Sequence, residues 1–255
     1  MQGGDQLGLL ADSQIPSLAG MQSRSVNERQ FSCRWWFFRG AMYLVMSSYF
    51  STDQPLYRQA WQCLTAWFTK VRPPAGIVLC LPMDLLLHAN SKVFFQTALL
   101  QQPLNYRLSV WVVVTHSECL PGLQIWSRQL SEQQRQQMLG GMVDRGLDGN
   151  CIGALDRTLH SVIQTLKITG LRHLNDYRKT PPAELLILPE QIRQPPPALE
   201  EYFLALFEPD HYQQHSLLCG LFFTATEDND NQSGSKSLFS QQLLEKILPA
   251  EKIQK

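Results

Sequence analysis

The chain has 255 residues, of which 44% are hydrophobic and 17% are charged, a composition typical of a globular protein with a sizeable core. Lysine and arginine together number 22, as do aspartate and glutamate, so the formal net charge is zero and the sequence has no basic footprint for nucleic acid or anionic lipid. The six cysteines are scattered without a Cys-x-x-Cys pair, which argues against a disulfide framework or a zinc site.

The sequence carries no pattern of a secretory signal or a membrane span. Residues 1–20 lack both the basic start and the continuous apolar stretch of a signal peptide. No apolar run elsewhere reaches the roughly 18 residues that a transmembrane helix needs. We therefore expect a chain that does not cross a bilayer by itself, and its cysteine usage suits a reducing compartment.

Short apolar runs alternate with helical periodicity in the first half of the chain. Residues 1–32 are rich in Gly, Gln and Ser and predict a weakly ordered segment. The predicted buried strands are residues 41–46, 76–81 and 108–114, and the predicted helices are residues 56–68, with Asp53 as a cap, and 91–101. Because strands alternate with helices, we expect a parallel sheet with crossover helices.

The second half is mostly helical until a strand returns. We predict helices at residues 131–139, 152–177 and 199–207, a glycine-rich loop at 140–153, a strand at 217–224, a flexible loop at 225–237 and a final helix at 238–247. This pattern divides the chain into the weakly ordered segment 1–32, an α/β domain at 33–150, a helical extension at 151–209, and a returning strand and helix at 210–255.

The strongest candidate for a binding site is the polar cluster Thr115-His116-Ser117-Glu118, which follows the predicted strand 108–114. Ligands of open α/β sheets bind at the carboxyl ends of strands. The cluster has the spacing of the base-reading loop of a GTPase, in which a lysine packs on guanine and an aspartate accepts from its ring N–H groups. His116 stands in the lysine position and Glu118 in the aspartate position, so we favour a strand-end loop without a ligand.

The phosphate and magnesium contacts of a nucleotide site are also not evident. The sequence has no Gly-x-x-x-x-Gly-Lys-Ser/Thr motif, and no lysine precedes Lys70. The predicted strand 41–46 ends in Met46-Ser47-Ser48, and methionine does not bind a hard cation. Thr115, His116 and Glu118 are therefore interpreted as remnants of a nucleotide site, and we expect no catalytic residue, metal or cofactor.

Three further clusters give weaker signals. His116-Ser117-Glu118 are neighbours in sequence, and neighbours rarely build a catalytic triad. His211 and His215 are four residues apart and lack a third metal ligand. The loop with Asp228, Asp230 and Asn231 lacks the Gly and the final Glu of a calcium loop. We interpret them as surface or loop residues.

An ordered series of segments runs from Cys33 to Ile253. They read CRWWFFRGAMYLVMSSYF, WQCLTAWFTKVRPPAGIVLCLPMDLL, LSVWVVVTHSECLPGL, LLILPEQI with LEEYFLALF, CGLFFTAT, and SLFSQQLLEKILPAEKI. In this order they resemble segments of the IcmF/TssM family, the large inner-membrane component of type VI secretion systems. The likeness rests on the order and number of the segments.

This resemblance implies a P-loop GTPase-like α/β fold with a helical extension, in a cytoplasmic part that sits beside the partner protein TssL and contacts baseplate components. The chain departs from the family at three places. The P-loop and its strand are absent, the magnesium-holding Asp-Thr-Ala-Gly is replaced around Met46-Ser47-Ser48, and only Thr115 keeps its residue in Thr-Lys-x-Asp. We therefore expect a non-catalytic scaffold at the inner face of the bacterial inner membrane rather than an enzyme.

Two alternatives stay open. The first is a nucleotide-binding or nucleotide-hydrolysing GTPase-like enzyme that uses Glu118 and an unconventional phosphate loop. The second is a fragment or remnant that folds poorly, because a sheet without its P-loop strand must close the gap or borrow a strand. Nucleotide titration separates the scaffold from the first alternative, and solution behaviour separates it from the second.

Overall fold

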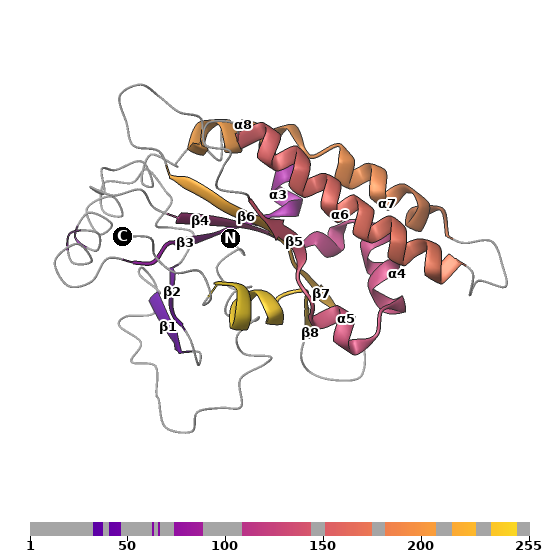
Figure 1. The fold of residues 1–255 in the computed structure, drawn as a ribbon, viewed down its shortest axis with the longest axis horizontal. Coiled ribbons are helices and arrows are strands. Elements are labelled where there is room, and N and C mark those ends of the chain that lie inside the picture. The colour runs from indigo at the N-terminus through magenta and orange to yellow at the C-terminus, as the bar shows by residue number, and fades with distance from the viewer. Residues whose placement is uncertain are drawn as a thin grey trace.

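The computed structural model describes residues 33–37, 41–46, 63, 66, 74–88, 109–143, 151–174, 182–207, 216–227 and 236–248. These residues form a mixed α/β fold around a four-stranded sheet with the order β3-β4-β6-β5. Strands β3, β4 and β6 run parallel and β5 pairs antiparallel with β6 (Figure 1). The strands are β3 (Ile77–Pro82), β4 (Ser109–Thr115), β5 (Leu139–Met142) and β6 (Leu217–Phe223).

Helices cover both faces of this sheet. The long helix α6 and its neighbours α7 and α8 lie on one side, and the C-terminal helical turns, drawn in yellow, lie on the other (Figure 1). The helical elements are α3 (Met83–His88), η4 (Ser117–Cys119), α4 (Pro121–Gln129), α5 (Glu132–Gln136), α6 (Cys151–Leu174), α7 (Ala183–Arg193), α8 (Pro197–Phe207) and the π-helical η6 (Leu243–Ile247).

Strand β4 is the centre of the core because both of its faces are buried. Val110, Val112 and Val114 pack with the large helical layer, whereas Trp111 and Val113 pack with η6 and its neighbours. This alternation follows from the two-residue period of a strand, and it explains why the whole run is apolar. The helices of the predicted extension share one hydrophobic cluster with the sheet, and the proposed domain boundaries stay a prediction.

Several predicted elements are confirmed. The strands predicted at residues 76–81, 108–114 and 217–224 are β3, β4 and β6, and the helices predicted at 152–177 and 199–207 are α6 and α8. The final helix forms at residues 241–248. The predicted helix 91–101, the weakly ordered segment 1–32, the cap Asp53 and the clusters around His211 and Asp228 lie outside the described residues, as does most of the helix 56–68.

The strand predicted at residues 41–46 forms but is not a buried strand of the main sheet. It is β2 (Met42–Met46), which pairs antiparallel with β1 (Cys33–Phe37) in a separate two-stranded sheet. Met42 is 59% exposed, and the Tyr43 hydroxyl donates to the Leu244 carbonyl at 3.0 Å. The prediction was wrong about burial because an apolar run does not reveal which sheet a strand joins.

The glycine-rich loop predicted at residues 140–153 was also partly wrong, since residues 139–142 form β5. Gly140 has a φ of 146°, and a Cβ atom there would overlap the Leu221 carbonyl of β6, so the glycine permits this close pairing. The predicted loop 225–237 likewise contains β7 (Ala225–Glu227) and β8 (Lys236–Leu238), which pair with each other. Helices α4 and α7 were not predicted.

Gly122 provides a test of the contact between α4 and α7. A Cβ atom at this position would overlap the Glu184 carbonyl oxygen and lie 2.8 Å from the Leu188 Cβ. We expect Gly122→Ala to lower the free energy of unfolding by about 1–3 kcal/mol because the two helices must separate. Urea denaturation followed by circular dichroism measures the change.

Gly170→Ala is the matched control for this variant. Gly170 lies in α6, and a Cβ atom there would have no neighbour within 4 Å. This substitution should leave stability unchanged or raise it by up to about 1 kcal/mol, through helix propensity. Equal effects of the two substitutions would contradict the close packing of α4 on α7.

Candidate functional site

The loop Thr115-His116-Ser117-Glu118 lies at the carboxyl end of β4, as predicted. His116 adopts a left-handed conformation with φ 56° and ψ 33°, which turns the chain sharply after the strand. The Ser117 amide then donates to the Thr224 carbonyl at 3.1 Å, and its hydroxyl donates to the Val114 carbonyl at 3.2 Å. The loop is therefore tied to the end of the neighbouring strand β6.

Glu118 is held by residues of its own chain. Its Oε2 accepts from the Thr226 amide at 2.9 Å, and its Oε1 accepts from the Thr226 hydroxyl at 2.8 Å. The His116 Nδ1 lies 3.0 Å from the same Oε1. Thr226 belongs to β7, so this carboxylate joins the loop after β4 to the strand that follows β6.

These contacts limit what Glu118 can do for a ligand. An ionised carboxylate offers about four acceptor positions, and three of them face groups of this chain. A carboxylate that reads guanine must present two acceptors to two ring N–H groups at once. Thr226 already supplies an N–H and an O–H in this paired fashion, so the base-reading geometry is satisfied internally.

The remaining groups around the loop give little support for nucleophilic chemistry. The Thr115 side chain is fully buried. Partial burial, with the nearby carboxylates of Glu118 and Asp84, raises the pKa of the Cys119 thiol to about 11. This thiol is therefore protonated near neutral pH, where it is a poor nucleophile and a poor metal ligand.

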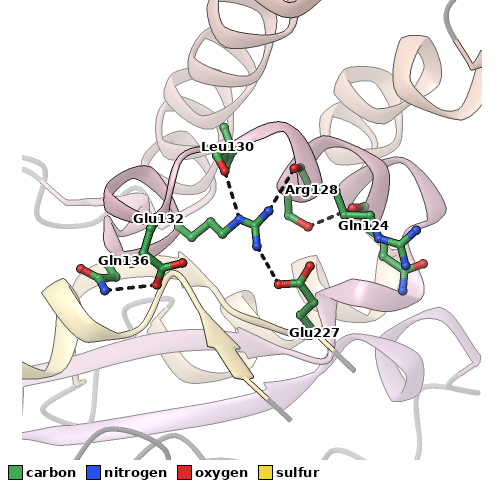
Figure 2. A network of polar contacts seen from close by, with 8 residues as sticks. Gln124, Arg128, Leu130, Glu132, Gln136 and Glu227 are labelled. Atoms are coloured by element: carbon green, nitrogen blue, oxygen red, sulfur yellow. Dashed lines mark hydrogen bonds and ion pairs between the residues drawn. The ribbon is translucent and has the colours of Figure 1, made fainter. Parts of the chain in front are cut away.

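A second polar contact, which the sequence did not reveal, is made by Glu227, the residue of β7 that follows Thr226. The Arg135 Nη1 donates to Glu227 Oε2 at 2.9 Å, while its Nε and Nη2 donate to the Leu130 and Arg128 carbonyls at 3.1 and 3.0 Å. Figure 2 shows these three contacts converging on one guanidinium group. Both charged side chains are at least four-fifths buried, and their residues are 92 positions apart.

The described residues contain neither a metal cluster nor a membrane-spanning helix. No group of three His, Cys, Asp or Glu side chains in these ranges is placed to hold a metal ion. None of the helices in the same ranges has the length and apolar composition that crossing a membrane requires.

Comparison with known proteins gives two matches. The family model described as the IcmF-related N-terminal domain matches residues 57–253. The protein named type VI secretion system component TssM1 of Pseudomonas aeruginosa is 24% identical over 212 residues, which cover 76% of this chain. The matched region is 19% of that relative, so the chain spans about a fifth of its length. No solved structure matches the chain.

The contact between Glu118 and Thr226 can be tested by a double-mutant cycle. Glu118→Ala should lower the free energy of unfolding by about 1–3 kcal/mol, because it leaves the Thr226 amide and hydroxyl without their acceptor. Thr226→Val removes only the hydroxyl, and the double variant should show a coupling of at least about 0.5 kcal/mol. Urea denaturation measures all four proteins.

Glu190→Ala is the control for a carboxylate that makes only a surface contact. Glu190 lies 3.6 Å from Arg193, and both side chains are about half exposed. Its loss should change stability by less than about 0.5 kcal/mol. A Glu118→Ala variant as stable as this control would argue against the internal role of Glu118.

Substitution of Arg135 should lower stability more than its position near the surface suggests. Arg135→Ala should lower the free energy of unfolding by about 3 kcal/mol, because it leaves the Glu227 carboxylate and two carbonyls without a donor. Arg135→Lys should recover little of this loss, since an ammonium group cannot reach all three acceptors in one plane. Thermal denaturation of these variants, with Arg193→Ala as a surface control, measures the loss of stability. Full recovery of stability with lysine would contradict the role of the three hydrogen bonds that the Arg135 guanidinium donates.

Proposed function

The chain belongs to the IcmF-related N-terminal domain family, and we propose that it is a non-catalytic scaffold domain of a type VI secretion membrane complex. Its work is protein–protein contact rather than nucleotide hydrolysis. Its fold is a GTPase-like α/β arrangement in which the nucleotide-binding parts have been lost or reused. This places Thr115, His116 and Glu118 in the role of a structural loop.

The occupied Glu118 carboxylate is the observation that carries this proposal. A functional base-reading loop must keep its carboxylate available for the base. Here the Thr226 amide and hydroxyl and the His116 ring take three of its acceptor positions. Binding a guanine would require breaking these contacts, and the cost would be subtracted from the binding free energy.

The phosphate and metal parts of the sequence support the same proposal. The chain has no lysine before Lys70 and no P-loop motif. Met46, Ser47 and Ser48 stand where the resemblance to the family implies the aspartate that holds magnesium. An enzyme with altered specificity retains at least part of its phosphate, metal and base contacts. In this chain all three are changed.

The relationship to TssM1 suggests where the scaffold works. We propose that it lies at the inner face of the bacterial inner membrane, beside a TssL-like protein and in contact with baseplate components. Because the chain spans about a fifth of TssM1, these partners are assigned by relationship to a much longer protein. The chain's own composition fits protein contact better than nucleic acid, since its net charge is zero.

A thermal melt with and without GTP or ATP and magnesium tests the non-catalytic part of the proposal. A ligand present at about 100 times its dissociation constant stabilises a protein by about 2.7 kcal/mol. For a domain of this size the melting temperature would rise by several degrees. We expect a cooperative melt that nucleotide does not change.

The same melt distinguishes the alternatives. A clear nucleotide-dependent rise would contradict the scaffold proposal and would make Glu118→Ala the first variant to examine. A melt without a cooperative transition would favour a chain that needs another segment to fold. Copurification with the cytoplasmic part of a TssL-like protein from the same bacterium tests the partner, and the absence of any complex would argue against the assigned position.

A further inference from the structure

Two buried threonines lie next to each other in register at the carboxyl end of the parallel sheet. Thr115 ends β4, and Thr224 directly follows β6. Thr115 is 0% and Thr224 is 1% exposed, and neither hydroxyl has a hydrogen-bond partner among the residues that the structure describes. Buried hydroxyls in native proteins are rarely left in this state, so this pair requires an explanation.

The register of the sheet places the two side chains on the same face. Val114 pairs with Phe223 in the parallel ladder, and the next residues along the two strands are Thr115 and Thr224. Val114 and Phe223 both pack in the large helical cluster, whereas Val113 and Phe222 pack in the cluster around η6. Strand alternation therefore directs both threonines to the η6 side of the sheet.

The nearest backbone carbonyls accept hydrogen bonds from other groups and accept none from these hydroxyls. The Val114 carbonyl accepts from the Thr224 amide at 2.9 Å and from the Ser117 hydroxyl at 3.2 Å. The Thr224 carbonyl accepts from the Ser117 amide at 3.1 Å. Thr158 provides the contrast, since this buried hydroxyl donates to the Ala154 carbonyl of its own helix at 3.0 Å.

We propose that Thr115 and Thr224 together bind one buried water molecule, which bridges their hydroxyls at the carboxyl end of β4 and β6. Each hydroxyl can donate one hydrogen bond and accept others, so a water molecule between them can be both donor and acceptor. Because both side chains are almost fully buried, a molecule bound between them would be shielded from bulk solvent. The site is distinct from the Glu118 contact, and it does not depend on the proposed scaffold role.

Valine substitutions test this proposal because valine has the shape of threonine without its hydroxyl. If a water molecule is bound, Thr115→Val and Thr224→Val each lower the melting temperature by about 2–4 °C in a chain of this size. The double variant then loses less than the sum of the two single losses, because both hydroxyls hold the same molecule. Thr115→Ser, which keeps the hydroxyl, should retain most of the coupling to Thr224.

Thr158→Val calibrates the loss of a buried hydroxyl that has a protein partner. If Thr115→Val and Thr224→Val leave the melting temperature unchanged or raise it while Thr158→Val lowers it, the hydroxyls hold nothing and the proposal is overturned. Strict additivity of two losses would overturn the shared molecule. Water-to-amide magnetisation transfer on the unmodified protein gives a second readout. We expect a long-lived water molecule at the amides of Thr115 and Thr224, and its absence would contradict the proposal.

Discussion

Two consecutive side chains of one short strand close the carboxyl end of the sheet. In β7, Thr226 satisfies the Glu118 carboxylate and Glu227 satisfies the Arg135 guanidinium. These contacts join the loop after β4 and the turn between α4 and α5 to β7, the strand that follows β6. Because the Arg135 and Glu227 side chains are mostly buried, neither can move into water without leaving an unpaired group behind.

The sequence predicted an element best where the pattern of that element's own residues reveals which of its faces are buried. β4 reads as an apolar run rich in β-branched residues because both of its faces are covered, and α6 has a long helical period because one stripe of it packs on the sheet. β5 reads as a loop because two of its four residues are glycine. Its strand conformation comes from pairing with β6, about 80 residues later, which no local pattern reports.

The same distinction holds for the candidate site. The position of Thr115, His116 and Glu118 at a strand end followed from the apolar run before them. Their partners did not, because Thr226 is 108 residues from Glu118 and occurs in a stretch that reads as a polar loop. Arg135 gave still less signal, since an arginine in a glutamine-rich helix is ordinarily solvated, and only the fold brings Glu227 beside it.

The chemistry of Glu118 relates the proposed loss of a ligand to the internal contact that the structure contains. A carboxylate shaped to accept two parallel hydrogen bonds is costly when it is partly buried and unoccupied. If the loop binds no base, as we propose, the chain must remove the charge, expose it or provide donors of its own. Thr226 provides an N–H and an O–H to the two carboxylate oxygens, much as the edge of a guanine would. Recognition of a ligand and stabilisation of the fold thus require the same arrangement of donors, and in this chain that arrangement joins β7 to the sheet.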